Sequence, residues 1–209
     1  KKAPKMSDFF RRMPFGLTGT GTVKESADFT IENGRISVSR DDAFKTDPAN
    51  LIMLYWLSER YNCGVHPDTI KLVTRSLKLI TKVVREDPRA NKLFVEILTS
   101  KREPELILRR MNESGVLGRF IPDFGRIIAH MQFNMYHHYT VDEHLLRAVG
   151  VVSEIERGEL AEAHPVSHEI IHTLKSRRTL FVAMFLHDIA KGRGEDHSIA
   201  GARVAAELC

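Results

Sequence analysis

Cysteine and long apolar runs are both scarce in this sequence of 209 residues. The two cysteines, Cys63 and Cys209, are too few for a disulfide framework, so we expect a reducing compartment, the cytoplasm. The longest apolar runs, Leu51–Leu57 and Leu180–Leu186, have seven residues each, whereas a membrane-spanning helix needs about 20. A signal-peptide pattern is also lacking. These absences predict a chain with no membrane span and no membrane partner.

Excess positive charge is confined to the start of the sequence. Residues 1–12 carry five cations and one anion, which accounts for the whole net charge of +4. A nucleic-acid-binding face would spread Lys and Arg over a folded surface, so we expect no nucleic-acid partner. The glycine-rich residues 16–22 lack the Gly-Lys-Ser/Thr ending of a phosphate-binding loop. We therefore interpret residues 1–27 as a solvated linker.

Proline marks four potential helix starts, and each is followed by apolar residues at helical spacing; Asp47 and Asp87 can also cap their helices. Proline is favoured at the first helical position, where its missing amide hydrogen costs no bond. The sequence therefore predicts four helices in its first part. The four pairs are Asp47-Pro48, His66-Pro67, Asp87-Pro88 and Glu103-Pro104.

One β-hairpin is predicted, because Asn33-Gly34 separates two short segments in which apolar and polar residues alternate. A further helix is expected from Pro122 to about residue 133. Thr140 and Glu143 have the spacing of a capping box, which predicts a helix from there to about residue 158. We expect a loop over 159–168, an apolar helix ending near residue 192, and a last helix from 197. The predicted fold is all-α, with a helical subdomain over 28–128 and a second domain over 129–209.

Histidine is concentrated in the second predicted domain, where nine of the ten histidines lie between residues 130 and 197. His187 and Asp188 directly follow an apolar run, and such a pair needs partners if it is buried. A divalent cation would satisfy both, since imidazole nitrogen and carboxylate oxygen suit zinc, manganese or iron. Lys191 shares their helical face. Ordinary hydrogen bonds within the protein are the alternative explanation.

The remaining histidines point less clearly to chemistry. His137 and His138 precede the capping box, and we interpret them as loop residues near a pocket mouth. His168 and His172 are four residues apart, but no glutamate of a zinc-protease pattern lies between them. We interpret these two, with His164, as surface residues.

The two histidine-bearing segments resemble the HD superfamily of metal-dependent phosphohydrolases. They are YTVDEHLLRAV, residues 139–149, and HDIAKG, residues 187–192. Over the longer segments 131–150 and 176–205, the sequence is similar to the HD domain of bacterial bifunctional uridylyltransferase/uridylyl-removing enzymes. Segments 50–61, 66–80 and 109–127 resemble the helical region before that domain.

This resemblance implies an HD-type domain over 129–209 that hydrolyses UMP from uridylylated PII, the nitrogen signal protein. It implies a divalent metal ion, Mn, Mg, Zn or Fe, held by His144, His187 and Asp188. Asp188, Lys191 and His197 would be the catalytic residues: Lys191 would neutralise charge on the phosphate, and His197 would protonate the departing phenolate. A further aspartate of the superfamily pattern and the nucleotidyltransferase signature are not found here, so we expect further domains in a longer chain.

Two other functions remain open at this stage. The first is a different HD enzyme that acts on nucleotides; for guanosine tetraphosphate hydrolases, a paired acidic motif is expected where Ile189, Ala190 and Lys191 stand. The second is a non-catalytic helical scaffold that senses or docks a partner.

Overall fold

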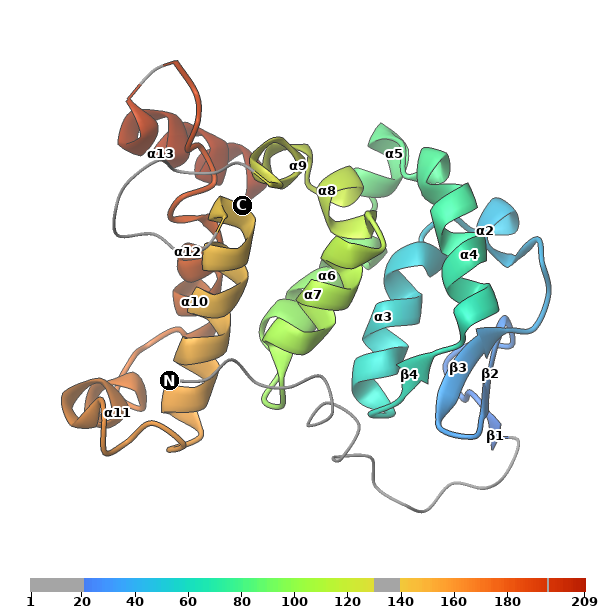
Figure 1. Cartoon of the computed structure of the whole chain (residues 1–209), viewed down its shortest axis with the longest axis horizontal. Coiled ribbons are helices and arrows are strands. Elements are labelled where there is room, and N and C mark those ends of the chain that lie inside the picture. Colours follow the sequence, from blue (N-terminus) through green and yellow to red (C-terminus); the bar gives the residue numbers. More distant parts are fainter. Residues whose placement is uncertain (1–20, 130–139, 195) are drawn as a thin grey trace.

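Helices make up most of the structure, and a small sheet lies at one end (Figure 1). A computed structural model describes residues 21–129, 140–194 and 196–209. The first part contains α2 (Ala43–Thr46), α3 (Asn50–Arg60), α4 (Pro67–Ser76), the 3-10 helix η1 (Leu77–Leu79), α5 (Lys82–Arg85), α6 (Pro88–Leu98), α7 (Pro104–Glu113), α8 (Val116–Phe120) and α9 (Pro122–Ile127). The second part contains α10 (Val141–Glu156), α11 (Pro165–Ile171), α12 (Arg177–Leu186) and α13 (His197–Leu208).

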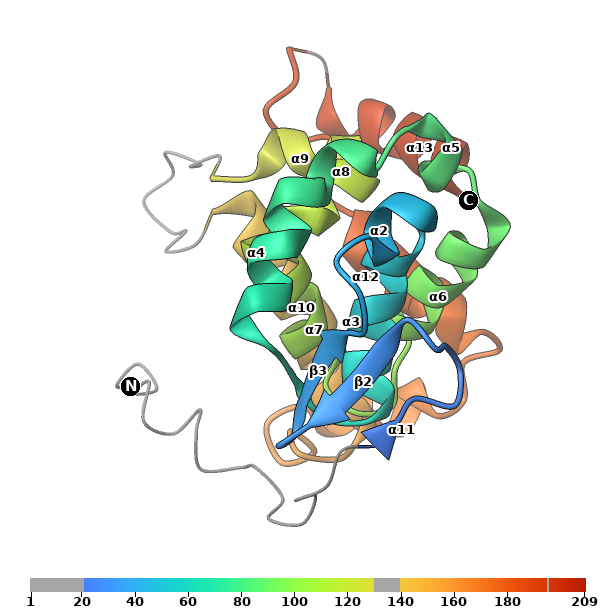
Figure 2. The ribbon, with the colours of Figure 1, turned by 90° about the vertical axis from the view of Figure 1, so that its right-hand side faces the viewer.

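The predicted hairpin is present (Figure 2), and two short strands extend it to a four-stranded sheet. Strands β2 (Phe29–Glu32) and β3 (Arg35–Val38) pair antiparallel, and Asn33 and Gly34 between them have φ of 50° and 70°. Positive φ at both turn residues matches the twist of the strands. At the two edges lie β1 (Gly21–Thr22), antiparallel to β2, and β4 (Gly64–Val65), parallel to β3.

The linker expected over residues 1–27 ends earlier than predicted. Residues 1–20 lie outside the described residues, whereas β1 pairs with the hairpin and Val23 is buried in the core. The Glu25 carboxylate accepts hydrogen bonds from Tyr61 Oη at 2.6 Å and Arg60 Nε at 2.7 Å. Residues 21–27 are therefore part of the folded structure, joined to the end of α3.

Three of the four proline-started helices, α4, α6 and α7, begin at their proline as predicted. The Asp87 side chain caps α6 by accepting a hydrogen bond from the amide two residues on. Helix α3 instead begins at Asn50, two residues after Pro48. The reason is local, because the first backbone hydrogen bonds after Asp47 join residues three apart, Asn50 to Asp47 and Leu51 to Pro48, and so form a turn before the helix.

The capping box predicted at Thr140 and Glu143 is not formed, although α10 begins where it was expected. Within the described residues, the Thr140 side chain makes no capping hydrogen bond. The Glu143 carboxylate is instead paired with Arg109 of α7. The Glu143 side chain therefore joins α10 to α7 instead of capping its own helix.

Three later boundaries also differ from the prediction. Helix α9 ends at Ile127, where the next residue is extended, and residues 130–139 lie outside the described residues. Helix α11 occupies part of the expected loop over 159–168. Helix α12 ends at Leu186 rather than near residue 192.

One hydrophobic core runs through both parts of the chain. Phe185 of α12 stacks on Phe124 of α9, with ring centroids 5.4 Å apart, and meets Phe94 of α6 edge-on at 5.7 Å. Helix α10 lies between α7 and α12, as Figure 1 shows. No helix in the described part of the chain has the length and apolar content that crossing a membrane requires.

Candidate metal centre

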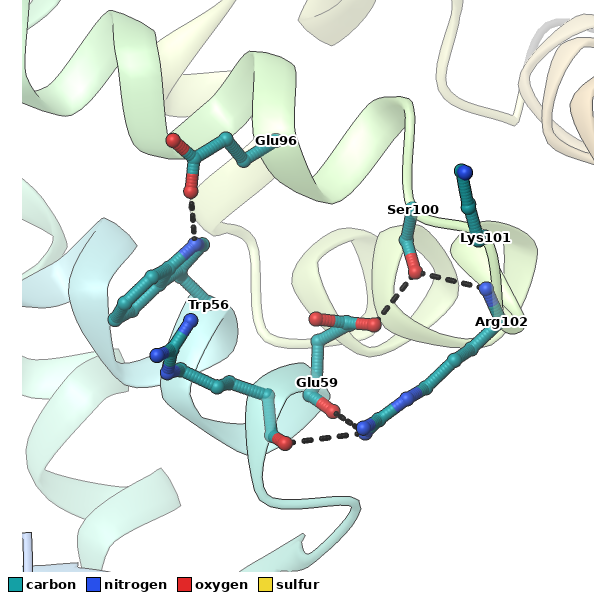
Figure 3. A pocket seen from close by; sticks show the side chains of 7 residues that line it. Trp56, Glu59, Glu96, Ser100, Lys101 and Arg102 are labelled. Atoms are coloured by element: carbon teal, nitrogen blue, oxygen red, sulfur yellow. Dashed lines mark hydrogen bonds between the residues drawn. The ribbon is translucent and has the colours of Figure 1, made fainter.

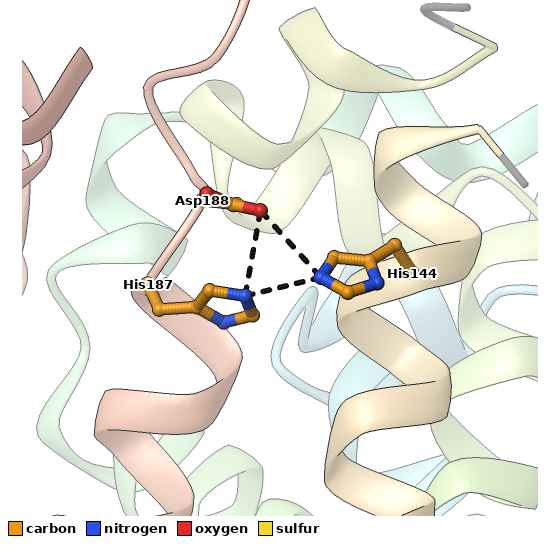
Figure 4. A group of neighbouring side chains, drawn as sticks. All are labelled: His144, His187 and Asp188. Atoms are coloured by element: carbon orange, nitrogen blue, oxygen red, sulfur yellow. Dashed lines mark hydrogen bonds and ion pairs between the residues drawn. The ribbon is translucent and has the colours of Figure 1, made fainter. Parts of the chain in front are cut away.

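Three of the predicted site residues lie together. His144 comes from the first turns of α10, while His187 and Asp188 directly follow the last residue of α12 (Figure 4). The two Nε2 atoms of the histidines are 3.2 Å apart. Asp188 Oδ2 lies 3.5 Å from Nε2 of His144 and 3.4 Å from Nε2 of His187. The three donor atoms thus form a nearly equilateral triangle.

The spacing of this triangle fits a divalent cation. An ion about 2.0–2.2 Å from each of its ligand atoms holds tetrahedral neighbours roughly 3.3–3.6 Å apart. Within the described residues, this is the group of three or more histidine, cysteine or acidic side chains whose donor atoms converge closely enough for a metal. Two imidazole nitrogens and one carboxylate oxygen are a donor set suited to zinc, iron or manganese.

The His187 ring is oriented by the helix that precedes it. Its Nδ1 lies 2.8 Å from the carbonyl oxygen of Met184, which can only accept, so Nδ1 carries the proton. The neutral ring then presents the Nε2 lone pair toward His144 and Asp188. Metal-binding histidines are commonly fixed in this way by a backbone carbonyl.

Asp188 is the most sheltered member of the group. Its side chain is 12% exposed, against 41% for His144 and 36% for His187. Lys191 Nζ lies 2.6 Å from the same Oδ2 that faces the histidines, and its side chain is 15% exposed. The ion pair of Asp188 with Lys191 is therefore shielded from solvent, whereas the two imidazole rings beside it are more open to solvent.

The His-Asp pair lies in a different backbone setting from the one predicted. It was expected inside an apolar helix, but His187 is the C-cap of α12 and Asp188 lies in the turn that follows. The loop after this turn bends at Gly192, which has a φ of 78°. Arg193 then pairs with Asp123 of α9 and joins the loop to the first part of the chain.

Not all predicted residues join the triangle. His197 is the first residue of α13, and its side chain lies outside the described part. His137 and His138 also lie outside the described residues. His164, His168 and His172 belong to α11 and its two ends, and the triangle contains none of them. The His168 ring is held against α10, because its Nδ1 donates to the Ile155 carbonyl oxygen at 2.8 Å.

A hollow of about 270 Å³ lies between α3 and the α6–α7 connection, apart from the donor triangle (Figure 3). Its polar groups are used to join these elements. Trp56 Nε1 donates to Glu96 at 2.6 Å, and Arg102 donates to the carbonyl oxygens of Glu59 and Arg60 at the end of α3. We assign this hollow a structural role.

Sequence reasoning missed the side chains that hold α10 in place. Asp142 is buried, and Glu143 pairs with Arg109 rather than with its own helix end. A signal for Asp142 was available, because it is aligned with Leu145, Leu146 and Val149 on the apolar face of α10. A carboxylate in such a row indicates a buried polar partner.

The fold and the donor set define a helical protein with a candidate divalent-metal centre between two of its helices. Residues 29–120 match the family model described as the uridylyltransferase GlnD third domain. This match supports a relationship of residues 29–120 to the PII uridylyltransferases, a family of enzymes. The matched segment lies within the helical subdomain predicted over 28–128. It ends before α10, so the three donor residues lie beyond it.

Proposed function

We propose that this chain carries the uridylyl-removing site of a PII uridylyltransferase, an HD-type phosphodiesterase that hydrolyses UMP from uridylylated PII. The observation that carries the proposal is the triangle formed by His144, His187 and Asp188, whose donor atoms lie 3.2–3.5 Å apart. The family match over residues 29–120 supports the choice of substrate, because it lies in the same chain as this triangle.

The three triangle residues would hold one divalent ion, and such an ion supplies an activated water and polarises a phosphoryl oxygen. The protein's contribution is to fix the donors in advance. The His187 proton is held on Nδ1 by the Met184 carbonyl, so Nε2 stays available. Asp188 is held in place by its ion pair with the ammonium group of Lys191.

The charge of Lys191 would also serve in binding the substrate. Lys191 presents a positive charge beside the donor triangle, where it would stabilise the phosphate of a bound UMP group. The leaving group is a tyrosine phenolate, whose pKa of about 10 makes it a good leaving group with little need for protonation. His197, at the start of α13, is the residue we assign to that proton.

The alternative of a nucleotide-directed HD enzyme would use the same metal centre on a different substrate. The family match favours the PII substrate, since it points to uridylyltransferases and not to nucleotide hydrolases. The non-catalytic scaffold explains neither the converging donors nor the orientation of His187.

The test is to incubate the chain with uridylylated PII and Mn²⁺, Mg²⁺, Zn²⁺ or Fe²⁺ and to follow the mass of PII. We expect metal-dependent loss of the UMP group in the wild type and no loss in His144→Ala. The matched control is His172→Ala, a histidine of the α11 end that should leave the rate unchanged.

Two results would count against the proposal. Absence of UMP release with every metal, both by this chain and by a longer chain that supplies the further aspartate of the superfamily pattern, would contradict it. Faster hydrolysis of free nucleotides than of uridylylated PII would favour the nucleotide-directed alternative instead.

A further inference from the structure

Asp142, two residues before His144, is a buried carboxylate that joins three elements. Only 4% of this residue is exposed. Oδ2 accepts a hydrogen bond from Asn112 Nδ2 of α7 at 3.0 Å, and Oδ1 accepts one from the Ala129 amide at 3.2 Å. The side chain therefore ties the first turn of α10 to α7 and to the residues after α9.

Burying a carboxylate costs free energy unless donors surround it. Asp142 meets this requirement with both oxygens bonded, in the first turn of a helix where negative charge is favoured. One donor comes from a strained position, because Ala129 has a φ of 57°, in the left-handed region that residues other than glycine seldom adopt. A buried charge and a strained backbone position each cost free energy. The contact of Asp142 with Ala129 therefore indicates that the position of α10 is fixed here, and not only that the fold is stabilised.

The position that this contact fixes is that of the metal-binding helix. Successive helical residues are about 100° apart, so side chains two apart point to nearly opposite sides. Asp142 faces α7, while His144 faces α12 and the donor triangle. A rotation or slide of α10 that broke the Asp142 contacts would carry His144 Nε2 away from its partners. Glu143, between them, is paired with Arg109 of α7 as well.

We infer that Asp142 is a positioning residue for the metal centre and that Asn112 acts through it. Asn112 belongs to α7, inside the segment that matches the third-domain family model. The matched segment thereby supplies the fixed surface that sets one metal ligand, although it contributes none itself. This inference rests on the proposed function, since it presupposes a metal at His144, His187 and Asp188.

An exchange of the amide and the carboxylate tests the inference directly. Asn112→Asp places two carboxylates face to face and should repel α10 from α7. The double variant Asn112→Asp with Asp142→Asn restores one amide and one carboxylate with their direction reversed, and the amide oxygen introduced at position 142 can still accept from Ala129. Asp142→Asn alone should be mild. Asn112 Oδ1, a buried atom without a hydrogen-bond partner among the described residues, can turn to accept the new amide.

The readout is Co²⁺ binding, followed by the visible absorption of the bound ion, which reports ligand geometry as well as affinity. We expect Asn112→Asp to weaken Co²⁺ binding by about tenfold or more and to alter the spectrum. The double variant should return both to near wild-type values. Asn50→Ala is the matched control, because Asn50 is a buried amide whose two hydrogen bonds lie within the first part of the chain. It should lower the melting temperature and leave Co²⁺ binding unchanged.

The possible failures can be told apart. If the wild type binds Co²⁺ no more tightly than His144→Ala, the metal centre itself is wrong, and both proposals fall. If His144 is required but Asn112→Asp binds like the wild type, only the positioning role is overturned. Loss of binding in Asn112→Asp without recovery in the double variant would overturn it too, because general destabilisation would then explain the loss.

Discussion

The first part of the structure, residues 21–129, and the second, the described residues from 140 onward, differ in how they are held together. The first part contains the sheet, and most of the buried core side chains lie in it. The second part has more large apolar side chains facing solvent. Among the described residues, these are Val83 and Ile128 in the first part, and Val166, Ile170, Leu174, Ile199 and Leu208 in the second.

The two parts therefore contribute to the candidate site in different ways. The second part supplies all three residues of the candidate metal centre, but its central helix α10 is held by ion pairs and hydrogen bonds to α7 of the first part. The first part is thus a scaffold that the second needs for its geometry. The predictions below test this dependence, starting from the largest expected effect.

Phe185→Ala should disturb both parts, because the ring packs against Phe124 and Phe94 across the boundary. We expect a loss of about 3–5 kcal/mol of unfolding free energy, typical of a buried Phe→Ala change. Urea unfolding should be followed by Trp56 fluorescence, which reports the first part, and by circular dichroism. Both midpoints should fall together. A shift in circular dichroism with unchanged fluorescence would show two independent cores.

Gly150→Ala should separate α10 from α7 where the two helices pack together. A Cβ at this position would overlap Glu105 Oε2, so the Glu105 carboxylate must leave its bonds to Arg109 and Arg147. We expect a net loss of about 1–3 kcal/mol in urea unfolding. The matched control is Gly201→Ala in α13, where the added Cβ meets only Ala190 at 4.0 Å and stability should not fall.

Paired cap variants compare helix starts in the two parts. Asp87 caps α6 with its carboxylate, so Asp87→Ala should cost about 1 kcal/mol. Thr140 precedes α10 without a side-chain capping bond in the described structure, so Thr140→Ala should change stability by less than about 0.5 kcal/mol. Thermal unfolding of both variants checks this. Equal losses would mean that Thr140 does cap its helix.

The thiols of Cys63 and Cys209 should react with an alkylating reagent at different rates in the folded protein. This comparison uses the wild type and involves no change in stability. Cys63 is buried in the first part, and burial raises the pKa of its thiol to about 11. Cys209 is exposed at the end of the second part. Since the thiolate is the reactive form, an alkylating reagent at about pH 8 should label Cys209 quickly in the folded protein. Labelling of Cys63 should require unfolding; rapid labelling of both would contradict its buried environment.

Much of the fold follows from local chemistry that the sequence displays. The Asn33-Gly34 turn and the prolines that begin α4, α6 and α7 were predictable because each acts within a few residues. The edge strands were not, since two-residue strands pair through the backbone and leave no side-chain pattern. Helix α11 was missed because its apolar side chains Val166 and Ile170 face solvent, so the usual one-sided periodicity does not reveal it.

The residues of the candidate site could be proposed from the sequence, but their arrangement in space could not. His144 and the His187-Asp188 pair were identified through a family resemblance, and no spacing rule could show that residues 43 positions apart have donor atoms 3.2 Å apart. The role of Glu143 could not be read locally either. The competing partner, Arg109, comes from another helix 34 residues earlier.

The most direct test of the metal centre compares metal affinity and folding in Asp188→Ala and Asp188→Asn. Zn²⁺ binding should be measured by calorimetry and thermal unfolding on the metal-free proteins. We predict that both variants lose Zn²⁺ affinity by about tenfold or more. The metal-free Asn variant, which keeps the side-chain shape and an acceptor for Lys191, should melt close to the wild type. Wild-type Zn²⁺ affinity in both variants would contradict the assignment of Asp188 as a ligand, and with it the proposed site.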